Sequence, residues 1–327
     1  MIVWIWLATS SGGPFDLTEG APLPAAFEPE FMQRALIAGL IAAVAAAVVG
    51  TWIVLRGLTF LGDALAHGVI PGLALAVLWG FSPIIGALLS AMVMSGAVTL
   101  VGRRARVRED VGIGLLFVGM LALGVIIISR SDSFTTDVTS LLFGDILGVT
   151  AADIRGQAVA AVLVVAACVI LHRPFLALAF NQDKARTLGM RPALAHAALL
   201  ALLAVAIVAS FDAIGTLLVF GLLIGPPATA GLLVRRVPLM MALAVVLGAS
   251  SVVVGLMISF HHGTAGGATI AGVAVAEFLV VLAGQEAIRA WRDRAGSPPG
   301  GKDRLAPNPQ GERAEPWPER PVTPIAG

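Results

Sequence analysis

The stretch ALIAGLIAAVAAAVVGTWIVL, which runs from Ala35 to Leu55, carries no charged side chain. A helix crosses the hydrocarbon core of a bilayer with about 20 mostly apolar residues, so this stretch is long enough to span a membrane. Comparable stretches recur along the chain and predict an all-α, polytopic membrane protein with about nine transmembrane helices. The expected spans are Ala35–Leu55, Ala64–Trp79, Pro83–Val101, Val111–Ile128, Arg155–Leu171, Ala193–Phe211, Ala213–Leu233, Pro238–Phe260 and Ala268–Ile288.

The composition also favours burial in lipid. The chain has 327 residues, of which 58% are hydrophobic and 13% are charged, and its mean hydropathy is +0.93. A soluble domain is usually about a quarter charged, so this chain has too few polar side chains to coat a soluble globule. Its formal net charge of +1 gives no support to a nucleic-acid partner.

Basic residues predict the orientation, because the cytoplasmic loops of membrane proteins are enriched in lysine and arginine. When the loop Gly102–Asp110 (GRRARVRED) is placed in the cytoplasm, only Arg34, Arg130 and Arg155 of the 21 lysines and arginines fall outside. We therefore expect the N-terminus outside and the C-terminus in the cytoplasm.

The chain divides into three expected regions. Residues 1–30 form an N-terminal lead, and residues 31–290 form the transmembrane domain. Residues 296–327 are rich in proline, glycine and charge and have almost no aliphatic side chains to bury. This composition predicts a disordered cytoplasmic tail.

The sequence GDALAH contains a possible metal site. Asp63 and His67 are four residues apart, which places a carboxylate and an imidazole on one face of a helix. These ligands suit zinc, manganese or ferrous iron, and ionisable groups inside membrane segments are costly enough to suggest a function. The alternative is an Asp–His hydrogen bond that caps the second helix, and the spacing alone leaves both open. The surrounding segment Leu55–Gly72 mixes polar residues, glycines and a proline, so we expect irregular backbone that lines an internal pathway.

Other positions carry weaker indications. His261 and His262 are adjacent in an expected outer loop, where they either collect metal ions or belong to a solvated loop. Glu277 falls inside the ninth span and indicates either a subunit contact or a water-filled cavity. Pro226 and Pro227 remove helix hydrogen bonds within the seventh span, so that helix is either kinked or broken along a transport pathway.

Several segments together resemble the permeases of zinc, manganese and iron ABC importers, the metal-type (ABC-3) permease family. The resemblance runs from about Phe31 to Ala287, and its most specific element is LRGLTFLGDALAHGVIPG, Leu55–Gly72. The supporting segments are REDVGIGLLF (Arg108–Phe117), LLFGDILGVTAADI (Leu141–Ile154), FNQDKARTLGM (Phe180–Met190) and LLIGPPATAGLLVRR (Leu222–Arg236).

The resemblance implies an ABC importer permease fold in a bacterial inner (plasma) membrane. It implies that two permease copies form one translocation path, that cytoplasmic ATP-binding subunits power it, and that an extracytoplasmic protein delivers the metal. It associates Asp63 and His67 with metal coordination. It also implies docking on the ATPase through Phe180, Asn181, Asp183, Arg186, Leu188 and Gly189.

The sequence has no GxxxxGK[ST] motif, so we expect ATP hydrolysis in a separate chain. We predict a transport subunit that is not an enzyme, has no cofactor of its own, and carries zinc in preference to manganese or iron. The alternatives are a siderophore or corrinoid ABC permease and a secondary metal carrier driven by an ion gradient. Three departures from the family are Asn181 in place of a common aspartate, the doubled Pro226–Pro227, and an unusual loop at His261–Gly267.

Overall fold

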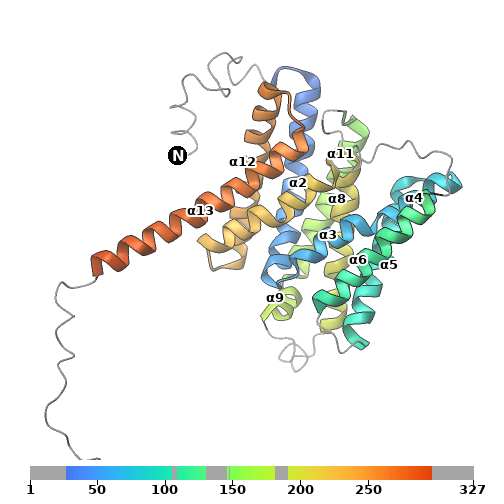
Figure 1. The fold of residues 1–327 in the computed structure, drawn as a ribbon, viewed down its shortest axis with the longest axis horizontal. Helices are drawn as coiled ribbons and strands as arrows, with labels where there is room; N and C mark the ends of the chain where they lie inside the picture. Colours follow the sequence, from blue (N-terminus) through green and yellow to red (C-terminus); the bar gives the residue numbers. More distant parts are fainter. Residues whose placement is uncertain (1–26, 105–108, 130–145, 147, 181–190, 297–327) are drawn as a thin grey trace, which may run out of the picture. The chain divides into compact units, whose positions relative to one another are not determined.

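The computed structural model describes residues 27–104, 109–129, 146, 148–180 and 191–296, and helices make up nearly all of this part (Figure 1). No strand occurs among the described residues. The helices are α2 (Glu30–Leu55), α3 (Thr59–Gly68), α4 (Ile70–Trp79), α5 (Pro83–Arg104), α6 (Glu109–Ile128), α8 (Ala151–Ile170), α9 (His172–Phe180), α11 (Pro192–Leu233), α12 (Val237–His262) and α13 (Gly266–Gly296).

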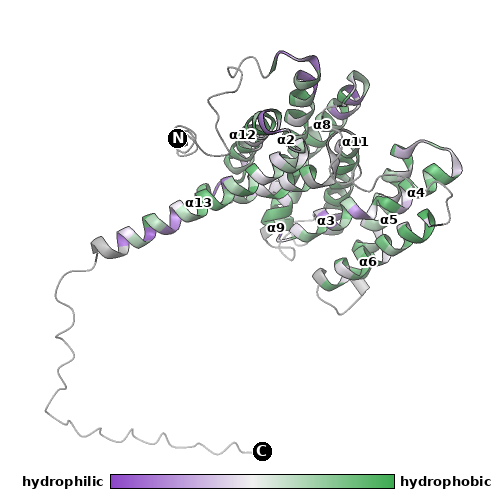
Figure 2. Ribbon diagram, turned by 45° about the horizontal axis from the view of Figure 1, so that its top comes forward, coloured by the Kyte–Doolittle hydropathy of each residue, from purple (hydrophilic) through white to green (hydrophobic). Residues whose placement is uncertain are grey.

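The described helices confirm the polytopic membrane fold. Eight of them, with α3 and α4 counted as one, are long and apolar enough to cross a membrane, and the shorter apolar helix Leu218–Leu233 adds to these. Figure 2 shows apolar residues along most of the helices and hydrophilic ones at the start of α2 and in the later, coloured part of α13. The expectation of about nine spans therefore holds for this part of the chain.

Helix α11 is two spans joined by a sharp reversal at Gly215, whose backbone is non-helical at φ 74° and ψ 163°. His196, in the first half, contacts Arg56 at the end of α2, and Leu223, in the second half, lies against Gly50 of α2. A straight helix would separate His196 from Leu223 by about 40 Å, whereas Gly50 and Arg56 are only about 9 Å apart along α2. The second half of α11 must therefore run back beside the first.

Helix α2 is the most buried span, and it packs against α8, α11 and α12. Small side chains permit this contact: the buried face of α2 is mostly alanine and glycine. A Cβ atom added at Gly39 would lie 2.7 Å from a methyl group of Val252 in α12. Small residues of this kind allow close packing between membrane helices, where lipid supplies no hydrophobic driving force for association.

The segment Leu55–Gly72 is more regular than we expected. Its one non-helical turn is Arg56–Leu58, where Gly57 has a φ of 68°, and Val69 separates α3 from α4. Helix α3 begins at Thr59 rather than near Ala64. The second span is therefore Thr59–Trp79. Irregular backbone is thus limited to this turn and to the junction of α3 and α4 at Val69, and the helices on either side satisfy their own polar groups in lipid despite the glycines.

Helices α4 and α5 form a close pair next to α3. A Cβ atom at Gly72 would lie 2.0 Å from the carbonyl oxygen of Gly86, so both positions require glycine. The Ser90 hydroxyl donates a hydrogen bond of 2.6 Å to the carbonyl of Gly68, at the end of α3. This bond satisfies a helix-end carbonyl and ties the GDALAH segment to α5.

Helix α13 carries both the last span and a more polar end. Its residues up to Ala283 belong to the same compact unit as the other spans, and Gly284 onward forms a second unit. Glu286 and Arg289 form an exposed ion pair of 3.2 Å in that second unit.

Candidate functional site

Asp63 and His67 lie one helical turn apart on α3, and Nε2 of His67 is 3.5 Å from Oδ1 of Asp63. Their side chains are partly exposed, at 31% for Asp63 and 24% for His67. The other residues of this turn, including Gly62, Ala64, Leu65 and Ala66, are buried. The pair therefore occupies the face of α3 that the rest of this chain covers least.

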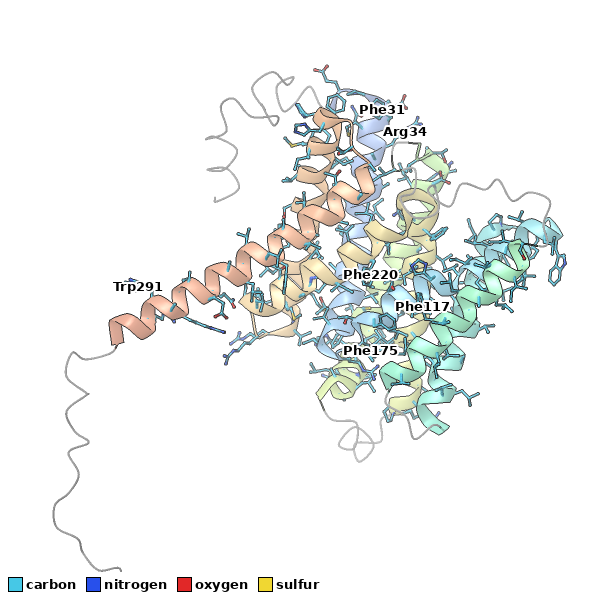
Figure 3. All side chains as sticks on the ribbon, viewed as in Figure 1. Phe31, Arg34, Phe117, Phe175, Phe220 and Trp291 are labelled. Carbon is cyan, nitrogen blue, oxygen red and sulfur yellow. The ribbon has the colours of Figure 1, made fainter. Side chains whose placement is uncertain are left out.

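Aromatic rings border the pair. The ring of Phe117 in α6 meets the His67 imidazole edge to face, with centroids 5.6 Å apart, and meets Phe60 at 5.8 Å. Figure 3 shows Phe117 between α3 and α6. Phe60 is three residues before Asp63 and 43% exposed, so it shares the face of the pair. Neither ring was predicted from the sequence, although the spacing of Phe60 from Asp63 could have identified Phe60.

The opposite face of α3 packs on the returning half of α11. A Cβ atom at Gly62 would lie 2.5 Å from Leu223 and 3.9 Å from the ring of Phe220, which Figure 3 labels in α11. This contact holds α3 with Gly62 turned toward the protein and Asp63 turned away from it. The orientation of the pair is thus fixed by packing.

Capping does not account for the pair. The N-cap residue of α3 is Leu58, and no side chain caps this end. The separation of 3.5 Å between Nε2 and Oδ1 is also longer than the usual N–H···O distance. Because the two groups share one face without a close hydrogen bond, both have lone pairs available to an outside ion.

The pair is not a complete metal site within the described part of the chain. Among the described residues, no group of three or more His, Cys, Asp or Glu side chains is arranged to hold a metal ion. One carboxylate and one imidazole leave at least half of the coordination positions of a zinc, manganese or ferrous ion open. Such an arrangement suits transient contact with a passing ion, provided that other ligands complete the site.

His261 and His262 lie in the last turn of α12, which ends at Gly263, so the expectation of a loop was wrong for both. A hydrogen bond of 2.9 Å joins Nδ1 of His261 to the carbonyl of Met257, and its ring contacts Phe260. Each histidine is partly buried. Their predicted contact with metal stays a prediction.

The segment predicted to dock on the ATPase begins at the end of α9. Phe175 in α9 is buried, and its ring meets Trp52 of α2 with centroids 5.6 Å apart (Figure 3). His172 meets the same tryptophan at 5.2 Å. The backbone of Phe180 ends α9, whereas Asn181, Asp183, Arg186, Leu188 and Gly189 lie outside the described residues. The contacts of His172 and Phe175 with Trp52 therefore hold α9 against α2.

Known proteins resemble this chain over most of its length. It is 34% identical to the manganese transport system membrane protein MntC of Halalkalibacterium halodurans, over 77% of this chain and 86% of that protein. It is also 34% identical to a probable iron transport system membrane protein of Haemophilus influenzae, over 78% of this chain and 93% of that protein.

Solved structures share the fold. The structure of PsaBC from Streptococcus pneumoniae in complex with Fab matches with a TM-score of 0.71 and 31% identity, over 79% of this chain and 94% of that chain. An inward-facing putative metal-chelate type ABC transporter matches with a TM-score of 0.64 and 15% identity, which supports the fold alone. The model of the ABC 3 transport family matches residues 28–285. The chain therefore belongs to the ABC 3 transport family and is a membrane permease subunit of a metal ABC importer, not its ATP-hydrolysing subunit.

Proposed function

We propose that this permease passes a bare divalent metal ion across the membrane and that Asp63 and His67 contact the ion on its way. The observation that carries the proposal is the position of the pair on the least covered face of α3, within an apolar span. An acid and an imidazole inside a membrane span are costly, and ion binding offsets that cost. Ligands that must also release the ion should be few, as they are here.

The ligand types and the relatives together favour a first-row transition metal. The relatives are named for manganese and iron transport, so we propose manganese or ferrous iron as the first cargo to test. Zinc, which the sequence analysis favoured, binds the same ligand types. Manganese binds most weakly of these metals in the Irving–Williams order, so a site selects manganese through its geometry and through the availability of the metal.

The incomplete site favours two permease copies around one path. The exposed face that carries Phe60, Asp63 and His67 needs further ligands, and the same face of a second copy would supply another carboxylate and another imidazole. We propose a homodimer in which these faces meet across the path. A symmetric pair of this kind is the commonest arrangement of identical subunits.

The remaining partners follow from the expected orientation. We propose a bacterial inner membrane location with the N-terminus outside and the C-terminus in the cytoplasm, as the distribution of lysine and arginine indicates. The segment from Phe180 to Gly189 would then face the cytoplasm and dock on an ATP-binding subunit. An extracytoplasmic protein would deliver the ion at the opposite side, near His261 and His262.

The test is ATP-driven uptake by proteoliposomes that contain this chain and its ATPase, supplied with manganese, ferrous iron or zinc. Asp63→Asn and His67→Gln keep the size of each side chain but weaken its metal binding, so each should lower uptake at limiting metal by about tenfold or more. The double variant Asp63→Ala/His67→Ala should abolish uptake while assembly with the ATPase persists. Glu286→Gln, which neutralises an exposed carboxylate, is the matched control and should transport normally.

Two results would contradict the proposal. Normal uptake by the double alanine variant would remove the role of Asp63 and His67. Uptake that follows an ion gradient without ATP would instead support a secondary carrier. Preferential uptake of a siderophore or corrinoid would support a siderophore or corrinoid ABC permease.

A further inference from the structure

A second polar cluster lies between α12 and α13, away from the Asp63–His67 pair. The Ser250 hydroxyl is 3.0 Å from Oε1 of Glu277, and the Ser251 hydroxyl is 2.9 Å from Oε2. Ser251 is fully buried, while Ser250 and Glu277 are partly buried. Figure 1 shows α12 and α13 as neighbouring helices, and these two contacts join them.

The cluster lies near the middle of the membrane. Ser250 is about 20 Å from the start of α12 at Val237, and Glu277 is about 16 Å from the start of α13 at Gly266, as the helical rise per residue gives. The hydrocarbon core is about 30 Å thick, so both positions fall close to its midplane. An ionised carboxylate at that depth is costly unless a positive charge accompanies it.

The oxygens of the cluster form a closed ring with too few hydrogens. Besides their contacts with Glu277, the Ser250 and Ser251 hydroxyls lie 2.7 Å and 2.9 Å from the carbonyl of Leu247. Four oxygen–oxygen contacts at hydrogen-bond distance therefore share two hydroxyl hydrogens, since each serine has one. Serines in helices often donate to a backbone carbonyl, as both hydroxyls can here to Leu247. Their contacts with the carboxylate oxygens then have no hydrogen, so a proton or a metal ion must lie at the carboxylate.

The described helix stretches that pack around the cluster carry no basic side chain. Helix α13 packs against α12 at Gly255 and against α11 at Gly221 and Gly225, and α2 packs against α11 and α12. No charged or histidine residue occurs in 35–55, 216–233 or 237–260, and within 266–284 only Glu277 is charged. The charged or histidine residues that flank these ranges in the sequence are Arg34, Arg56, Asp212, Arg235, Arg236, His261, His262 and Glu286. Among the described stretches that pack around the cluster, no side chain therefore supplies the compensating charge, whereas a small bound cation could.

We propose that Glu277, Ser250 and Ser251 form an intramembrane binding site whose cation is a proton. A proton on the carboxyl neutralises its single charge and supplies one of the two hydrogens that the ring lacks, which the carboxyl can donate to one serine hydroxyl. A divalent ion would leave an uncompensated positive charge, because the stretches that pack around the cluster carry no second acid. The site is separate from the proposed metal path, and it does not depend on which metal the permease carries.

The experiment is chemical modification by dicyclohexylcarbodiimide, an apolar reagent that reacts with protonated carboxyl groups. The permease is treated in proteoliposomes from acid to alkaline pH, and the modified residue is located by peptide mass spectrometry. We expect the adduct on Glu277 at neutral pH, its loss as the pH rises, and no protection by manganese, zinc or sodium. Because the adduct is located in the protein without any substitution, the result does not depend on whether a variant folds.

Two variants complete the test. Glu277→Gln should lose the adduct completely while keeping the hydrogen-bonding shape of the side chain, whereas Glu286→Gln, in the exposed part of α13, should keep it. Absence of the adduct from Glu277 at every pH would overturn the proposal. Protection of Glu277 by manganese, zinc or sodium at constant pH would also overturn it, because the site would then hold a metal ion.

Discussion

At Gly50, the returning half of α11 approaches α2 backbone to backbone. A Cβ atom at this position would lie 1.9 Å from the carbonyl oxygen of Leu223 and 2.9 Å from its carbonyl carbon. Residue 227, four positions after Leu223, is a proline and has no N–H to donate to that carbonyl. The proline thus leaves the Leu223 oxygen without its helical partner, and glycine gives that oxygen room against α2.

We predict that Gly50→Ala destabilises the protein strongly. The clash is with backbone atoms that no rotamer change can move, so the cost should reach or exceed the upper end of the about 1–3 kcal/mol typical of overpacking. Thermal unfolding of the purified protein in mild detergent measures the effect. Gly119→Ala in α6 is the control, because a Cβ atom there meets nothing within 4 Å. Equal unfolding temperatures for the two variants would contradict the packing at Gly50.

The returning path of α11 depends on the backbone of Gly215. Its φ of 74° and ψ of 163° lie in a region that only glycine visits without strain. Asparagine tolerates the left-handed helical region but not this one. The same substitution should therefore have different effects at Gly215 and at Gly80, whose φ of 70° and ψ of 29° are left-handed helical and whose surroundings are open.

We predict that Gly215→Asn lowers the folded yield and the unfolding temperature, with a cost of about 1–3 kcal/mol from backbone strain. Gly80→Asn should stay close to the unmodified protein by the same measures. The comparison uses size-exclusion profiles and thermal unfolding in one detergent. A harmless Gly215→Asn, or an equally harmful Gly80→Asn, would show that the strain at Gly215 does not govern the reversal.

The spans were predictable because lipid imposes a length and a composition that hydropathy reports directly. The break between the sixth and seventh spans was expected close to Gly215, where it lies. The start of α3 at Thr59 was not, since Asp63 obscured an apolar pattern that extends past it. Sequence spacing placed Asp63 and His67 on one helical face, but it could not show which neighbours leave that face uncovered.

Contacts between helices were the least predictable feature of the molecule. Glu277 was noted as an unexplained acid, and its serine partners come from another helix, 26 and 27 residues earlier in the chain. Sequence periodicity reports which face of a helix is apolar, and not which other helix covers it. The ring of Phe117 beside His67 escaped prediction for the same reason, because α3 and α6 are separated by the α4–α5 pair.

The arrangement of spans in the whole molecule makes a prediction about sidedness. Between Ser82 and Arg235 the described chain crosses the membrane with α5, α6, α8 and the two halves of α11, an odd number of crossings. These two residues should therefore face opposite sides, with Ser82 outside and Arg235 in the cytoplasm, as the arginine-rich loops indicate. If α11 instead ran through without reversing at Gly215, the number of crossings would be even and both residues would face the same side.

Accessibility of single introduced cysteines distinguishes these cases. Ser82 and Arg235 are both exposed, so Ser82→Cys and Arg235→Cys each add one thiol that the reagent can reach. The native Cys168 is fully buried and should not be labelled. A membrane-impermeant maleimide applied to spheroplasts should label Ser82→Cys at once and Arg235→Cys only after permeabilisation, with the unmodified protein as the blank. If Arg235→Cys were labelled at once and Ser82→Cys only after permeabilisation, the protein would have the opposite orientation in the membrane. Labelling of both from one side would contradict the reversal at Gly215, and with it the contact between Leu223 and Gly50.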